Sequence, residues 1–162
     1  MAKRKSKSNL GKILGMVAGI LGIVAILMIF VDTIKIPDTK FIEGKGYTGL
    51  EVVFGFKEKD TAVFNFSIMA LLPYLLMIVG TVLSFSNAVS KKGNKVLDFV
   101  TAGLFAVAAI LCFLMPNFVV CADTLAGKIA AEIDYVTTTG AIVSAVASLG
   151  AAAISGIKAI TK

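Results

Sequence analysis

The sequence predicts an all-α integral membrane protein, a four-transmembrane-helix bundle with a small extracellular antiparallel β-sheet in its first loop. Of the 162 residues, 57% are hydrophobic and only 16% are charged, which is not the composition of a soluble domain of this size. The apolar residues gather in four uncharged runs, each long enough to cross about 30 Å of hydrocarbon as a helix. These runs are residues 13–31, 62–85, 99–122 and 135–157.

The first run follows a basic segment, residues 1–12, and therefore has to be distinguished from a secretory signal peptide. A signal peptide has a similar basic start, but its apolar part is about 7 to 15 residues long and ends at a small-residue cleavage site. Here the run has 19 residues and ends in Phe30-Val31-Asp32, without such a site. We expect it to be retained as the first transmembrane helix.

The long loop after this helix, residues 32–61, carries an alternating pattern. Apolar side chains recur at every second position from Leu50 to Phe56, which is typical of a half-buried strand. Residues 33–36 and 40–43 offer a partner strand, and Gly44-Lys45-Gly46 a hairpin turn. A lone hairpin is marginal in water, so we expect it to rest on its own helices, on a neighbouring subunit or on an extracellular partner. The expected contact residues are Phe41, Tyr47, Leu50, Val52, Phe54 and Phe56.

The second and third apolar runs each contain one proline. Pro73 lies in mid-run and is expected to kink the second helix, whereas Pro116 lies near the outer end of the third.

Cys112 and Cys121 are nine residues apart, about 13 Å along a helix, which is too far for a disulfide between them. We therefore expect both cysteines to remain without an intrachain partner.

The distribution of lysine and arginine predicts the orientation. One side of the membrane would hold residues 1–12, the 86–98 loop and the tail 158–162, with ten basic residues against Asp98 alone. The other side would hold the long loop and the segment 123–134, with six basic residues against nine acids. We expect both termini to be cytoplasmic and the protein to lie in the plasma membrane.

Leu125, Ile129 and Ile133 recur at helical spacing, so segment 123–134 is expected to form a short amphipathic helix or an extension of the fourth span.

Small residues recur at helical spacing in the first and fourth spans. In lipid there is little hydrophobic drive between helices, so close backbone approach over small side chains supplies much of their packing. These ladders are expected to pack helices within the chain or, alternatively, between subunits. Their members are Gly11, Gly15, Gly19 and Gly22 in the first span, and Gly140, Ser144, Ser148, Ala152 and Gly156 in the fourth.

The chain lacks the residues that most catalytic sites need. It has no histidine, and the four runs contain no charged residue, although ion-coupled transporters usually place charge in the membrane. Neither a phosphate-binding loop, a nucleophile elbow nor a metal-ligating cysteine pair is present. We therefore expect no enzyme activity, no cofactor and no metal site. The excess of positive charge lies beside the membrane and favours anionic lipid over nucleic acid.

The arrangement of four spans, cytoplasmic ends and a long first external loop with a sheet resembles the claudin and peripheral-myelin-protein tetraspan family. Gly49-Leu50 is similar to the Gly-Leu part of that family's first-loop signature. Glu51 stands where the family's Trp would follow, and the first-loop cysteine pair is absent, so no functional residue is transferred. The resemblance implies lateral self-assembly, with extracellular loops that contact partners.

The sequence thus favours a non-enzymatic structural or interaction protein that forms a homo-oligomer in the lipid bilayer. Two alternatives stay open. The protein could be an oligomeric pore or a transporter subunit lined by serine and threonine of the fourth span. It could also be an accessory subunit of a larger membrane complex, bound to an extracellular or membrane protein partner.

Overall fold

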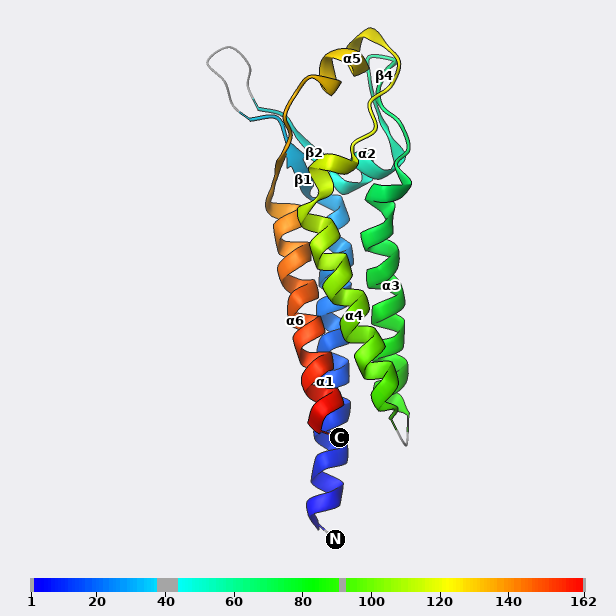
Figure 1. The fold of residues 1–162 in the computed structure, drawn as a ribbon, viewed down its shortest axis with the longest axis vertical. Helices are drawn as coiled ribbons and strands as arrows, with labels where there is room; N and C mark the ends of the chain where they lie inside the picture. The colour runs from blue at the N-terminus through cyan, green and yellow to red at the C-terminus, as the bar shows by residue number, and fades with distance from the viewer. Residues whose placement is uncertain (1, 38–43, 91–92, 162) are drawn as a thin grey trace.

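Four long helices run side by side in the computed structural model, which describes residues 2–37, 44–90 and 93–161 (Figure 1). All four are long and apolar enough to cross a membrane, which confirms the predicted number of long apolar helices. The helices are α1 (Ala2–Leu27), α3 (Ile68–Val89), α4 (Lys95–Phe113) and α6 (Thr139–Thr161).

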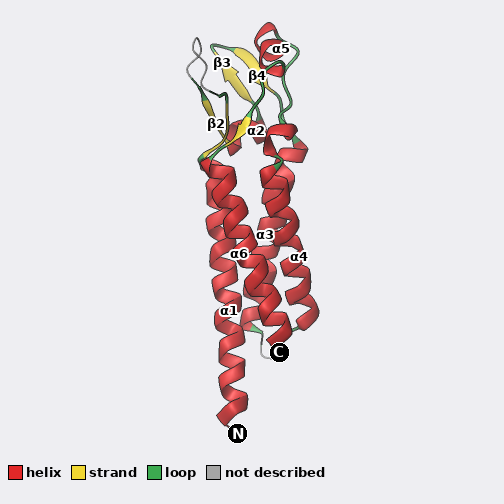
Figure 2. Cartoon of the chain, turned by 60° about the vertical axis from the view of Figure 1, so that its left-hand side comes forward, coloured by secondary structure: helices red, strands yellow, loops and turns green. Residues whose placement is uncertain are grey.

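The four helices form a ring in which every neighbour is antiparallel. Helix α1 packs on α3 and α6, and α4 packs on the same two helices from the other side. Both chain termini lie at one end of this bundle, which we call the terminal end, and the strands lie at the other (Figures 1 and 2). The up-and-down order produces this arrangement, because consecutive antiparallel helices pack on each other. The connection between α3 and α4 is short, whereas those between α1 and α3 and between α4 and α6 carry the strands and short helices at the other end.

The helices begin and end at capping residues, so their bounds differ from those of the apolar runs. The Ser67 hydroxyl accepts a hydrogen bond from Ala70 N and starts α3 six residues into the second run. Asn94 caps α4 in the same way, through Val96 N. The apolar residues left over at the far end of the bundle form strands and turns, because strand pairing there satisfies their backbone groups.

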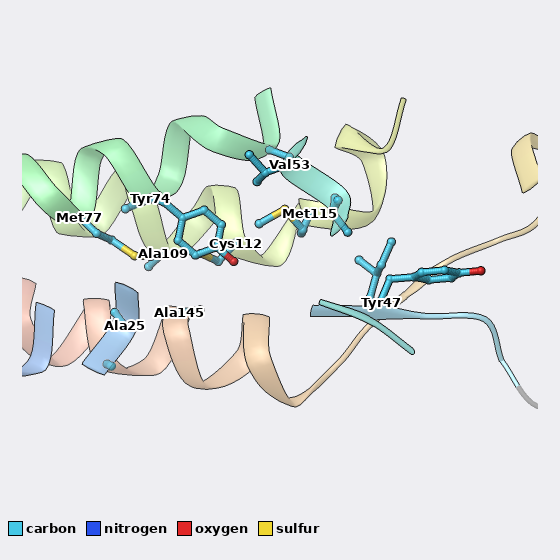
Figure 3. Close-up of a cluster of buried hydrophobic side chains, with 14 of the residues drawn as sticks. Ala25, Tyr47, Val53, Tyr74, Met77, Ala109, Cys112, Met115 and Ala145 are labelled. Atoms are coloured by element: carbon cyan, nitrogen blue, oxygen red, sulfur yellow. The ribbon is translucent and has the colours of Figure 1, made fainter. Parts of the chain in front are cut away.

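The core of the bundle contains a few large side chains among many small ones. Tyr74, Met77, Phe105 and Met115 are buried, and alanines from α1, α4 and α6 surround them (Figure 3). Cys112 is buried in this core and Cys121 is partly exposed, and both are free thiols, which confirms the prediction of no bridge between them.

The small-residue ladders lie mostly inside this one chain. A Cβ atom added at Gly19 would meet the Phe85 ring, and one added at Gly22 would meet Thr81 Oγ1 and the Phe105 ring. Gly140 packs against the backbone of Val31 and Asp32. Of the other ladder residues, Gly15, Ser144 and Ser148 are buried and Gly11 and Ala152 are half-buried, whereas a Cβ added at Gly156 would meet no described atom within 4 Å.

Two small antiparallel sheets cover the far end of the bundle. The first has the strand order β2 (Gly46–Thr48), β1 (Asp32–Lys35), β5 (Val136–Thr137), so a small antiparallel sheet exists as predicted and also recruits the segment before α6. The predicted hairpin turn Gly44-Lys45-Gly46 is wrong, because Gly46 lies in β2 opposite Lys35 and Ile36 N donates to Lys45 O. The second is a hairpin of β3 (Phe56–Glu58) and β4 (Thr61–Phe64). Its turn residues, Lys59 and Asp60, have φ of 47° and 67°, as a two-residue hairpin turn requires.

The predicted strand from Leu50 to Phe56 is wrong over most of its length. Residues Gly49–Phe54 form the short helix α2 instead, and only Phe56 belongs to a strand. The cause is a capping box: Thr48 Oγ1 accepts from Glu51 N at 3.3 Å, and Glu51 Oε2 accepts from Thr48 N at 2.7 Å. Apolar residues at alternate positions in so short a segment do not outweigh a helix start of this kind.

Glycine at the helix contacts gives the first testable expectation. We expect Gly22→Ala to destabilise the bundle by about 1 to 3 kcal/mol, because the new methyl overlaps Thr81 and Phe105. Gly103 in α4 is the matched control, since a Cβ there meets no described atom within 4 Å and Gly103→Ala should leave stability unchanged or raised. Thermal unfolding in detergent, followed by circular dichroism, compares the two variants. Equal melting temperatures would contradict the packing assigned to Gly22.

Candidate functional site: the head and a buried ion pair

The head is the part of the chain beyond the helix ends, residues 32–37, 44–66 and 114–138. Three segments distant in sequence are joined there by backbone hydrogen bonds. Asn65 N donates to Val120 O at 2.8 Å, and Ala122 N donates to Val63 O at 2.9 Å. Because β5 also pairs with β1, the second half of the chain is bound to both sheets of the first half. The head is therefore one unit and not two independent loops.

An aromatic cluster forms the interior of the head. The Tyr47 ring lies edge-on to Phe56 at 5.5 Å and to Phe64 at 4.8 Å between centroids, and Tyr135 lies 5.8 Å from Phe64. Burial raises the pKa of the Tyr47 hydroxyl, an effect that the Lys45 ammonium partly offsets, so the ring stays neutral at physiological pH. Lys45 covers this cluster, 4.8 Å from the Phe56 centroid, and pairs with Glu58 at 3.0 Å.

Helix α5 (Leu125–Ala131) lies at the end of the head farthest from the bundle (Figures 1 and 2). Its start is fixed, since Thr124 Oγ1 accepts from Gly127 N and donates to Ala62 O of β4. Gly127 packs directly against the Ala122 backbone, where a Cβ would overlap it. This mounting leaves Leu125 78% and Ile129 58% exposed on one side of the helix.

The predicted extracellular contact residues do not share one surface. Tyr47 and Val52 are buried, Leu50 and Phe56 are half-buried, and only Phe54 is exposed, at 60%. Phe41 lies outside the described residues. Sequence reasoning placed these side chains on one face of a strand, whereas the turn into α2 sends them in different directions. The spacing of Leu125 and Ile129 predicts a short amphipathic helix or an extension of the fourth span, and the structure has the short helix, α5. Nothing in the sequence shows which side of that helix is covered.

A buried ion pair joins α4 and α6 near the terminal end of the bundle. Lys158 Nζ lies 2.8 Å from Asp98 Oδ1, and the two side chains are only 2% and 3% exposed. The short distance between opposite charges makes this contact an ion pair. Within the described residues, Lys158 Nζ has no hydrogen-bond partner of good geometry. Asn87 of α3 supports it, with Nδ2 donating to Asp98 Oδ1 at 2.6 Å.

Helices α3 and α1 also contact the region of the ion pair. Asn94 N donates to Asn87 Oδ1 at 2.6 Å, so the cap of α4 and the end of α3 are joined. Gly15 of α1 lies against the lysine, because a Cβ there would approach Lys158 Nζ to 2.7 Å. Asp98 and Lys158 each lie one residue outside an apolar run, so the sequence predicts Asp98 in the 86–98 loop and Lys158 in the tail 158–162. The structure corrects this: both are helical and buried, because each neutralises the other.

The chemistry available in these two regions is limited. In the described part of the chain, no three residues of the types histidine, cysteine, aspartate and glutamate gather as a metal ion would need. The ion pair is closed off from solvent, and the head presents apolar and charged side chains on fixed elements.

Comparison with known proteins adds no relative. No protein-family model, no curated protein and no solved structure matches the chain.

Removal of one partner of the ion pair gives the second expectation. We expect Lys158→Met to destabilise the bundle by about 3 to 5 kcal/mol, because Asp98 is left as an unpaired buried charge. The double variant Asp98→Asn with Lys158→Met should recover most of this loss. Lys95→Met is the matched control, since Lys95 is exposed near the start of the same helix as Asp98. Thermal unfolding in detergent measures all three, and a single variant as stable as the control would refute a structural role for the pair.

Proposed function

We propose that this protein is a non-enzymatic multi-pass membrane protein that acts by protein contact and associates with further copies of itself. Its helical bundle anchors the head, and the head makes the contact. The termini would lie in the cytoplasm and the head outside the cell, as the excess of lysine and arginine at the terminal end favours.

The observation that carries the proposal is the exposed pair Leu125 and Ile129 on a firmly mounted helix. The exposed apolar side chains of the four long helices are explained by lipid, in which they would lie. This explanation does not extend to α5, which is at the far end of the head (Figure 1). An apolar face held there in water favours burial against another protein.

The contacts inside the bundle favour this role over an oligomeric pore. Ser144 Oγ donates to Ala25 O of α1 at 2.6 Å, and Ser148 and Ser155 are buried in the same chain. The serines of α6 therefore face their own bundle and are not available to line a channel between subunits. The small-residue ladders are likewise used within the chain, so the association between copies is assigned to the head.

The test is the number of copies in each particle. We expect the wild type to form oligomers in lipid nanodiscs and the double variant Leu125→Ser with Ile129→Ser to shift toward single copies, since the apolar contact is lost. Lys57→Ser, an exposed position on β3, is the control and should associate as the wild type does. Mass photometry of nanodiscs, with cross-linking in intact membranes, provides the measurement.

Two results would overturn the proposal. A wild type that stays a single copy at every protein-to-lipid ratio would exclude self-association. Solute flux through proteoliposomes that Ser148→Ala changes would instead support the pore.

A further inference from the structure

We propose that Phe54 and Phe66 form an anchor in the interfacial layer of the outer lipid leaflet, so that α2 belongs to the membrane-contacting part of the protein. This inference rests on the proposed placement of the four long helices in a bilayer. It concerns a surface that the self-association described above does not use.

The two rings form one exposed apolar surface. Phe54 is 60% exposed and Phe66 is 52% exposed, and their centroids lie 6.3 Å apart. They come from different elements, the end of α2 and the turn before α3. Complete transfer of a phenylalanine side chain from water to an apolar medium stabilises by about 1.5 to 3 kcal/mol, and the exposed part of each ring leaves a share of this unrealised in water.

The backbone fixes the two rings beside each other. Ser67 N donates to Val53 O at 2.9 Å, which ties the end of α2 to the start of α3. Gly55 permits the close turn from α2 into β3 beside the end of β4, since its φ is +94° and a Cβ there would meet Phe64 O at 2.8 Å. The pair therefore follows from the fold and not from a chance position of two flexible side chains.

The height of the pair matches the lipid interface. Phe66 is two residues before Ile68, the first residue of α3, so the two residues lie at most about 7 Å apart along the chain. The interfacial layer on each side of the hydrocarbon is about 5 to 7 Å thick. If the first turn of α3 lies in hydrocarbon, the phenylalanine pair lies within this layer.

Further exposed apolar side chains follow the pair along α3. Ile68 and Met69 are 63% and 57% exposed, and Leu72 and Leu75 follow on the same helix. At the corresponding ends of α1 and α4, Phe30 is 64% and Phe113 is 47% exposed. Both views place α2 at the junction of bundle and head, level with these helix ends (Figures 1 and 2).

Exposed charged residues follow Phe54 in the chain, with Lys57 and Glu58 on β3. Glu51 of α2 is half-buried and is held in the capping box with Thr48. The change from aromatic to charged side chains over three or four residues is what an interfacial boundary requires, with rings toward the acyl chains and charges toward water. Lipid is therefore the occupant that fits this surface.

The absence of tryptophan from the chain makes a direct measurement possible. Phe54→Trp introduces a single tryptophan, and lipids brominated either near the headgroup or deep in the acyl chain quench its fluorescence according to depth. Phe66→Trp provides a second variant at the same height, in case the first folds poorly. Val79→Trp, in the middle of α3, and Leu125→Trp, on α5, are the deep and the aqueous controls.

We expect headgroup-proximal bromines to quench Trp at positions 54 and 66 more strongly than deep bromines do. Position 79 should show the opposite order, and position 125 no quenching by either lipid. If positions 54 and 66 behave as position 125 does while position 79 is quenched, the anchor is refuted and the membrane placement stands. If position 79 is also not quenched, the proposed membrane function itself fails.

Discussion

The Asp98–Lys158 ion pair is the contact on which the terminal end of the bundle depends. It neutralises two charges that are 3% and 2% exposed, and neither could be buried alone without a cost of several kcal/mol. The pair also determines its neighbours: Asn87 has to supply a donor to the carboxylate, and Gly15 has to be free of a side chain. All four helices thus meet at one charge pair, although the pair itself lies on α4 and α6.

Elsewhere the helices are joined by hydroxyl groups that reach backbone carbonyls of another segment. Ser84 donates to Gly15 O at 2.8 Å, Ser144 to Ala25 O at 2.6 Å, and Ser67 to Phe118 O at 2.6 Å. These bonds need close helix approach, which the glycines of α1 permit on one side and the alanines of α6 on the other. Small and hydroxyl side chains therefore act together, and both are used inside a single chain.

This self-contained bundle leaves three kinds of apolar surface that differ in height. The helix sides suit the acyl chains, the phenylalanine pair at α2 suits the interface, and Leu125 with Ile129 lies beyond both. A firm mounting of α2 on α3 and of α5 on β4 keeps these heights constant relative to each other. The proposed anchor would then hold the head at the membrane surface, and the proposed protein contact would hold it at its far end.

The sequence alone determined that there are four apolar helices, that a small antiparallel sheet lies between the first two, and that the cysteines do not bridge. The helices and the sheet follow from the order of apolar and polar residues along the chain. The absence of a bridge between the cysteines follows from their separation along one predicted helix. The helix at Gly49–Phe54 was also set locally, by a capping box between Thr48 and Glu51 that the alternating apolar pattern outweighed in the prediction. The tertiary structure decided the rest: whether β5 joins β1 depended on pairing across more than a hundred residues. Asp98 and Lys158, taken one at a time, are each expected outside the membrane. Burial of either becomes favourable only because the two side chains meet across α4 and α6.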